Sequence, residues 1–176
     1  MATVYAALDR EALSDAVPTI LLAGCWEGLC LGGAQAAVLR SSGIVVWRWI
    51  AVTVAGAAIG YGLSLLGGTG GNAAETGQAE PPVALVMLLG AAMGLFMGAV
   101  MGALQAFASK GALSMRWWIV WNMVGWAPAM AIIMAAASLV SRSMTLPTIA
   151  AVGALSGGLA GLVLGAVTQR GLPQFR

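Results

Sequence analysis

The sequence of residues 94–105 is GLFMGAVMGALQ, in which glycine occupies positions 94, 98 and 102. An α-helix has about 3.6 residues per turn, so this spacing places Gly94, Gly98 and Gly102 on one helix face. That face carries no side chains, and inside a bilayer the backbone of a second helix can approach it closely. The stretch therefore predicts a membrane-spanning helix that packs against another helix through its glycines.

Glycine recurs at this spacing in two other apolar stretches, and we call each of the three sets a glycine ladder. The other two ladders consist of Gly24, Gly28 and Gly32 and of Gly157, Gly161 and Gly165. Gln35 and Gln105 each follow the last glycine of a ladder by three residues and so stay on the ladder face. We expect each glutamine to hydrogen-bond across a helix interface, which contributes roughly 0.5–2 kcal/mol in lipid.

The composition is that of an integral membrane protein. Of the 176 residues, 60% are hydrophobic and 8% are charged, and the mean hydropathy is +0.93. A soluble domain of this size needs more charge to cover its surface. The net charge of +2 comes without a basic cluster, so we expect no nucleic-acid partner.

Several functional classes are excluded by residues that the sequence lacks. It contains no histidine, the commonest ligand of haem and zinc and the usual proton shuttle. We therefore predict no metal site, no cofactor and no catalytic triad. Residues 67–71 (GGTGG) lack the Gly-Lys-Ser/Thr ending of a phosphate-binding loop, so we also predict no nucleotide partner. This pattern favours a protein that is not an enzyme.

Five apolar stretches are long enough to cross a hydrocarbon core about 30 Å thick at about 1.5 Å per residue. They cover about 18–39, 44–66, 83–109, 117–140 and 147–168, within a single transmembrane helical domain at 18–176. Residues 1–17 are predicted to form an extracytoplasmic tail, with an amphipathic helix at the membrane interface as one option. We expect Pro18 to occupy the first helical turn, where its missing N–H costs nothing.

The basic residues divide unequally between the two sides of the membrane that alternating spans define. One side carries six, namely Arg40, Arg48, Lys110, Arg116, Arg170 and Arg176. The other side carries two, Arg10 and Arg142. The positive-inside rule therefore predicts an outside N-terminus and a cytoplasmic C-terminus in the inner (plasma) membrane of the cell. The tryptophans at 47–49 and 117–121 are predicted to be interfacial anchors.

The sequence also repeats. A shift of 70 residues aligns residues 24–47 with residues 94–117 and matches three glycines, a glutamine and a tryptophan. This match predicts a duplicated helical hairpin, to which the ladder at 157–165 adds one further helix. We expect the three ladder helices to run in the same direction and to pack centrally.

The repeated pattern begins as Glu-Gly-xxx-Gly-xx-Gln-Ala-xx-Leu-Arg over residues 27–40 and continues into a Trp-rich helix start. It resembles uncharacterised bacterial multi-span membrane proteins. The resemblance implies a helical membrane fold and no particular activity.

Glu27 is the one acid inside a predicted span. An intramembrane carboxyl group is costly, which makes it a candidate for proton handling, cation binding or pairing with a partner subunit. No basic residue of this chain is expected at its depth, so we expect Glu27 to be neutral or paired with another protein. The structural alternative is a neutral acid bonded to a neighbouring backbone. Together with Gln35, Gln105 and Asn122, Glu27 forms our candidate intramembrane polar site.

Met93, Met97 and Met101 form a stripe beside the glycines of residues 94–102. Thioether rows can pass Cu(I), and the stripe resembles the methionine features of copper-uptake channels. Those channels use external methionine clusters that are missing here, so we favour adaptable packing as the role of the stripe. Pro128 lies inside the 117–140 span and is expected to kink it.

The sequence thus favours a non-enzymatic accessory or structural subunit of a larger membrane protein complex. Its expected partners are membrane lipids and other integral membrane subunits or further copies of itself. The alternative is a small transport component with a polar site around Glu27, either a channel or a substrate-binding subunit that resembles those of energy-coupling transporters.

Overall fold

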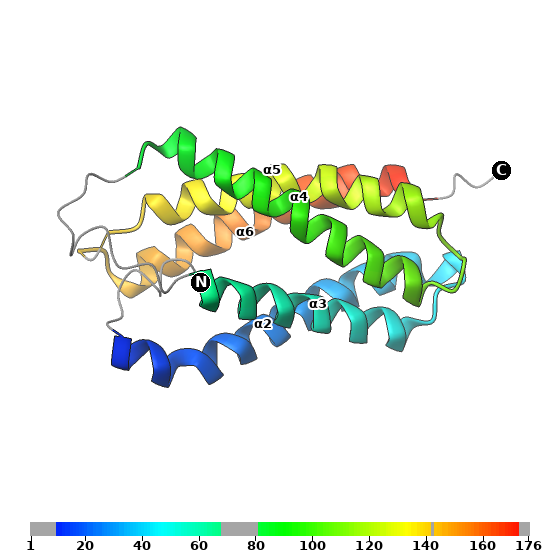
Figure 1. The fold of residues 1–176 in the computed structure, drawn as a ribbon, viewed down its shortest axis with the longest axis horizontal. Coiled ribbons are helices and arrows are strands. Elements are labelled where there is room, and N and C mark those ends of the chain that lie inside the picture. The colour runs from blue at the N-terminus through cyan, green and yellow to red at the C-terminus, as the bar shows by residue number, and fades with distance from the viewer. Residues whose placement is uncertain (1–9, 68–80, 142, 173–176) are drawn as a thin grey trace.

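The computed structural model describes residues 10–67, 81–141 and 143–172. Over these residues the chain is helical, with five long helices connected in antiparallel succession (Figure 1). Their bounds are α2 (Arg10–Leu39), α3 (Val46–Gly67), α4 (Val83–Ala108), α5 (Met115–Ser138) and α6 (Leu146–Thr168). Short 3₁₀ turns follow α2 at Arg40–Ser42 and α6 at Gln169–Gly171. The five helices are long and apolar enough to span a membrane, as the sequence predicts for a multi-pass membrane protein.

The start of the first helix differs from the prediction. Pro18 lies in the interior of α2, not in its first turn, because the helix already begins at Arg10. Proline removes one intrahelical hydrogen bond, and membrane helices tolerate this loss. Residues 10–17 therefore belong to the same continuous helix as the first candidate span, which begins at Val17, while residues 1–9 lie outside the described part. α5 likewise remains helical on both sides of Pro128.

The helices pack in chain order. α2 lies against α3, α4 against α5 and α6 against α5, while α3 and α4 join the two hairpins. α2, α4 and α6 run in one direction and α3 and α5 in the other (Figure 1). The expectation that the three ladder helices pack centrally is wrong for α2 and α6, because each of these packs mainly against one helix, α3 and α5 respectively. The short turns at Gly43 (φ 78°) and Gly111 (φ 89°) fold each helix back onto its predecessor, so each hairpin buries its ladder internally.

Two glycine ladders lie at the helix contacts within the hairpins. A Cβ atom built on Gly28 of α2 would lie 2.8 Å from the Cα of Val54 in α3. A Cβ atom on Gly98 of α4 would lie 2.6 Å from the carbonyl oxygen of Asn122 in α5. Real side chains do not approach backbone this closely, so both helix pairs need glycine at these positions.

Methionines of α4 fill the contact between the two hairpins. The Met101 Sδ and Cε atoms lie 2.9 Å from the place that a Cβ on Gly56 of α3 would occupy. The Met97 Cε atom lies 2.7 Å from the equivalent place at Gly60. The flexible thioether side chains thus occupy hollows that glycines leave on the facing helix.

The third ladder has no such contact. Cβ atoms built on Gly157, Gly161 and Gly165 would meet nothing within 4 Å in the described part of the chain. The predicted packing role of these three glycines therefore has no counterpart among the described residues. α6 instead packs on α5 through an adjacent stripe, in which Ala160 and Leu164 contact Ala129.

Candidate functional site

The two ladder glutamines meet at the junction of the hairpins. Gln105 Nε2 of α4 donates a hydrogen bond of 2.8 Å to Gln35 Oε1 of α2 and one of 3.1 Å to the hydroxyl of Thr53 in α3. Gln105 is fully buried, as is Thr53. Because an unpaired amide in an apolar interior is costly, this bonding holds the two hairpins in one register.

A buried tryptophan completes the bonding of each glutamine. Trp49 Nε1 of α3 donates to Gln35 Oε1 at 3.2 Å, and Trp118 Nε1 of α5 donates to Gln105 Oε1 at 3.1 Å. The two indole rings meet edge to face, with their centroids 5.4 Å apart. The amide–indole cluster, as we call Gln35, Thr53, Gln105 and these two tryptophans, thus links α2, α3, α4 and α5.

Apolar side chains pack around this cluster, and its two tryptophans belong to the same buried set. The buried set is Ala36, Leu39, Ile44, Trp49, Ala106, Leu113 and Trp118. Trp49 and Trp118 are 0% and 2% exposed, so the prediction that all tryptophans at 47–49 and 117–121 are interfacial anchors is wrong for these two. Their indole N–H groups find acceptors in the protein core, and the neighbouring Trp47 and Trp117 remain exposed.

Asn122 lies next to the amide–indole cluster and bonds only to the backbone of one of its members. Its Nδ2 donates to the carbonyl oxygen of Trp118, one turn earlier on α5, at 2.9 Å. Its Oδ1 is buried and has no partner among the described residues, and the same is true of Trp126 Nε1. α5 therefore carries one buried acceptor, on Asn122, and one buried donor, on Trp126, that lack a hydrogen-bond partner among the described residues. The two groups lie one turn apart, near the contact with α4.

Glu27 lies apart from the other three candidate residues. It precedes Gln35 by eight residues on α2, or about 12 Å along the helix axis. The phenol of Tyr61 in α3 donates a hydrogen bond to Glu27 Oε2, so the partner of this acid belongs to the same chain. Gly24 provides the space for the phenol, because a Cβ on it would lie 2.7 Å from the Tyr61 Cγ atom.

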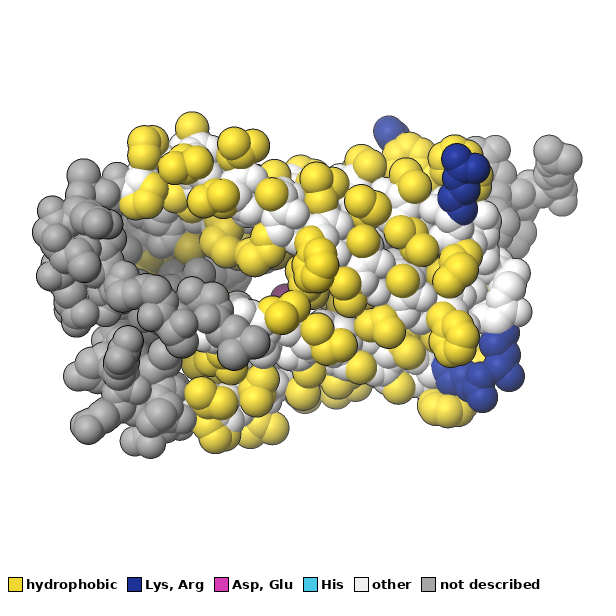
Figure 2. Space-filling model, in the orientation of Figure 1, with side chains coloured by type: hydrophobic (Ala, Val, Ile, Leu, Met, Phe, Trp, Pro, Cys, Tyr) yellow, Lys and Arg dark blue, Asp and Glu magenta, His cyan; other side chains and the backbone are white. Residues whose placement is uncertain are grey.

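The Glu27 carboxyl group is not enclosed by the bundle. Glu27 is exposed within this chain, and it is the one acid whose side chain the structure describes. The acid colour in Figure 2 is visible only at a small opening between the helices. The candidate polar site therefore divides into a closed amide–indole cluster and an open Glu27–Tyr61 pair.

Sequence reasoning missed the partners of these polar residues. The shift of 70 residues pairs Trp47 with Trp117, whereas the buried tryptophans are Trp49 and Trp118 and do not align under that shift. A signal existed in the spacing, because a tryptophan lies 14 residues after Gln35 and another 13 residues after Gln105. No comparable spacing in the sequence identified Tyr61 as the partner of Glu27.

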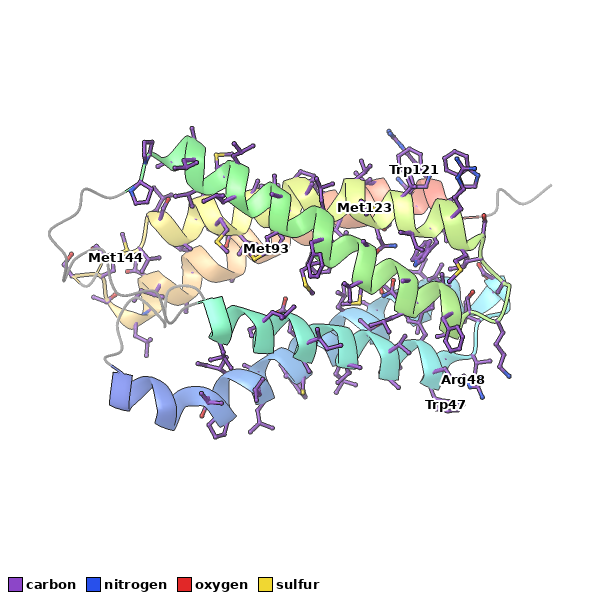
Figure 3. The ribbon with its side chains drawn as sticks, in the orientation of Figure 1. Trp47, Arg48, Met93, Trp121, Met123 and Met144 are labelled. Atoms are coloured by element: carbon purple, nitrogen blue, oxygen red, sulfur yellow. The ribbon has the colours of Figure 1, made fainter. Side chains whose placement is uncertain are left out.

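The cationic side chains that the structure describes gather at one end of the bundle (Figure 2). Arg48 lies 5.3 Å from the Trp47 ring centroid, and Arg170 lies 5.7 Å from the Trp121 ring centroid. Figure 3 shows Trp47, Arg48 and Trp121 at this same end. Aromatic rings with cations over their faces are typical of the level where a helix leaves the hydrocarbon core.

Comparison of the chain with protein-family models, with curated proteins and with solved structures gave no match.

Proposed function

We propose that this protein is a non-enzymatic accessory subunit of a larger complex in the plasma membrane, and that α6 packs against a transmembrane helix of another subunit. The uncovered ladder of Gly157, Gly161 and Gly165 carries the proposal. The ladders of α2 and α4 have the same glycine spacing, and each is covered by a neighbouring helix.

The side chains around the third ladder support a helix as the occupant. Leu155 and Leu162 are 76% and 73% exposed within this chain, and Leu159 is 52% exposed. Leucines beside a bare glycine groove supply the ridges that a second helix needs, while the groove allows its backbone to come close. Lipid chains solvate such leucines equally well, so close backbone packing is what favours a protein partner.

The bonding of the core polar groups supports a structural role over a catalytic one. Gln105 is engaged by Gln35, Thr53 and Trp118, all of them residues of the same chain. Groups that are fully buried and bonded to one another hold helices together and do not face a substrate. The gathering of the described cations at one end, where Arg48 and Lys110 line the same depression, supports a cytoplasmic location for that end.

The experiment is purification of the protein from its native membrane in mild detergent, followed by mass spectrometry of the intact complex. We expect a stoichiometric membrane subunit that is lost in Gly161→Leu, because the new side chain fills the groove. Gly33→Leu is the matched control, since Gly33 also faces open space but lies outside the ladders. A complex that survives Gly161→Leu, or a wild-type chain that purifies alone, would overturn the proposal.

The second candidate is a small transport component, and the Glu27–Tyr61 pair at the opening favours it. An acid that stays exposed at an opening between the helices could bind or pass a cation or proton. Ion or proton flux into liposomes that contain the purified protein would test this function. Flux that is lost in Glu27→Gln would support transport, and equal flux in wild-type and empty liposomes would exclude it under those conditions.

A further inference from the structure

We propose that the cationic end of the bundle carries a site for the phosphate group of an anionic phospholipid, bound between Arg48 and Lys110. Arg48 lies in the first turn of α3 and Lys110 in the turn that follows α4, and both line one depression at the junction of the two hairpins. The site is distinct from the uncovered face of α6.

A depression of about 470 Å³ lies at this junction. It is lined by Arg48, Ala106, Phe107, Lys110, Gly111, Leu113 and Met115. These residues come from the beginning of α3, the end of α4, the turn that follows α4 and the beginning of α5. The depression is therefore at the level where the apolar spans end, which is the depth of lipid headgroups.

The charge of the depression is positive and is not neutralised within the described part of the chain. Neither Arg48 nor Lys110 forms an ion pair with a described acid, and the first turns of α3 and α5 contain no acidic residue. Arg48 lies in the first turn of α3, where the helix dipole adds partial positive charge. Two unpaired cations beside two helix N-termini make a site that attracts an anion.

The walls of the depression are suited to the apolar part of a lipid. Phe107 is 80% exposed and Met115 is 52% exposed, both beside the cations. A phospholipid can place its phosphate between Arg48 and Lys110 while its glycerol and upper acyl chain cover these two side chains. A free phosphate ion would leave this apolar surface uncovered, so the combination favours a lipid.

The Arg48 side chain lines the depression and is held by a neighbouring aromatic ring. Its guanidinium carbon lies 5.3 Å from the Trp47 ring centroid, a cation–π contact that restricts the motion of the side chain. Arginine can bind two phosphate oxygens at once, while Lys110 adds a second point charge from the opposite hairpin.

The experiment measures lipid binding to the full-length protein by native mass spectrometry, with phosphatidylglycerol and phosphatidylcholine as probes. We expect phosphatidylglycerol to bind more tightly, because phosphatidylcholine carries a compensating cation. Arg48→Gln and Lys110→Gln should each weaken phosphatidylglycerol binding about fivefold, and the double variant about 25-fold, with little effect on phosphatidylcholine. Arg48→Lys should retain more binding than Arg48→Gln because it keeps the charge.

Arg116→Gln is the matched control, because Arg116 is an exposed cation that stacks over Trp117 and does not line the depression. It should leave phosphatidylglycerol binding within about twofold of wild type, since most surface substitutions have small effects. Equal loss in Arg116→Gln, or unchanged binding in the double variant with an intact thermal transition, would overturn the site. Competition by glycerol phosphate at the lipid's own concentration would overturn the assignment to a membrane lipid.

Discussion

Gln105 Nε2 lies 2.8 Å from Gln35 Oε1, and this hydrogen bond joins two residues that are 70 positions apart in the sequence and lie in different hairpins. Each glutamine also accepts an indole N–H from the second helix of its own hairpin. The contact between the hairpins therefore combines a polar centre with the methionine packing of Met97 and Met101. In an apolar bilayer, such a polar centre specifies which faces meet.

A double-mutant cycle measures this relationship. Gln105→Met keeps the side-chain length but removes the bonds to Gln35, Thr53 and Trp118, so we expect a loss of about 1–3 kcal/mol in unfolding free energy. With Gln35→Met, the coupling energy should be about 0.6–2 kcal/mol. The measurement is SDS-induced unfolding in mixed micelles, followed by tryptophan fluorescence.

Gln169→Met is the control for this cycle. Gln169 is exposed, and its side chain donates to the carbonyl oxygen of Ala166, three residues earlier at the end of α6, at 3.0 Å. Its replacement should change the unfolding free energy by less than about 0.5 kcal/mol. Additive effects of the two substitutions at Gln35 and Gln105 would contradict direct coupling between the amides.

The glycine ladders predict opposite responses to the same substitution. Gly98→Ala places a methyl group 2.6 Å from the Asn122 carbonyl oxygen and the Met123 Cα atom, so α4 and α5 must separate. We expect a loss of about 1–3 kcal/mol. Gly161→Ala meets open space and should leave the isolated chain unchanged or stabilise it by up to about 1 kcal/mol. Unfolding of both variants in mixed micelles, with any partner subunit removed, makes the comparison, and equal effects would contradict the assigned contacts.

The differences between sequence and structure have identifiable physical causes. The glycines at 94–102 predict a close-packed helix because bare backbone can be recognised without knowing what covers it. The helix that covers this groove could not be predicted, because any apolar helix can pack against a bare groove. In the structure the covering helix is the next one in the chain, because a short turn folds it back. Trp49 and Trp118 resembled the exposed tryptophans beside them in sequence, and only the fold brings them to Gln35 and Gln105.

The infrared absorption of the Glu27 carboxyl group should depend on its hydrogen bond from the Tyr61 phenol. Tyr61→Phe removes the hydrogen bond to Glu27 Oε2, and Gly24→Ala should displace the Tyr61 ring by collision with its Cγ atom. We expect both variants to shift the infrared band of the Glu27 carboxyl group in the same direction, because both weaken one bond. Glu27→Gln identifies that band by its loss. A band that stays in place in Tyr61→Phe would contradict the pairing.

The end of the bundle that carries Arg48 and Lys110 should face the cytoplasm, because short basic segments are retained on that side. Cysteine labelling in right-side-out membrane vesicles tests this in a chain whose free Cys25 and Cys30 are replaced by alanine. Ser114 lies at the cationic end and makes no side-chain cap bond, and Ser143 lies in the exposed turn before α6 at the opposite end. An impermeant maleimide should label Ser143→Cys in sealed vesicles but should reach Ser114→Cys only after the vesicles are opened. Both positions are exposed, so the side of the membrane and not burial within the protein decides whether the reagent reaches them. The reverse labelling pattern would invert the proposed orientation.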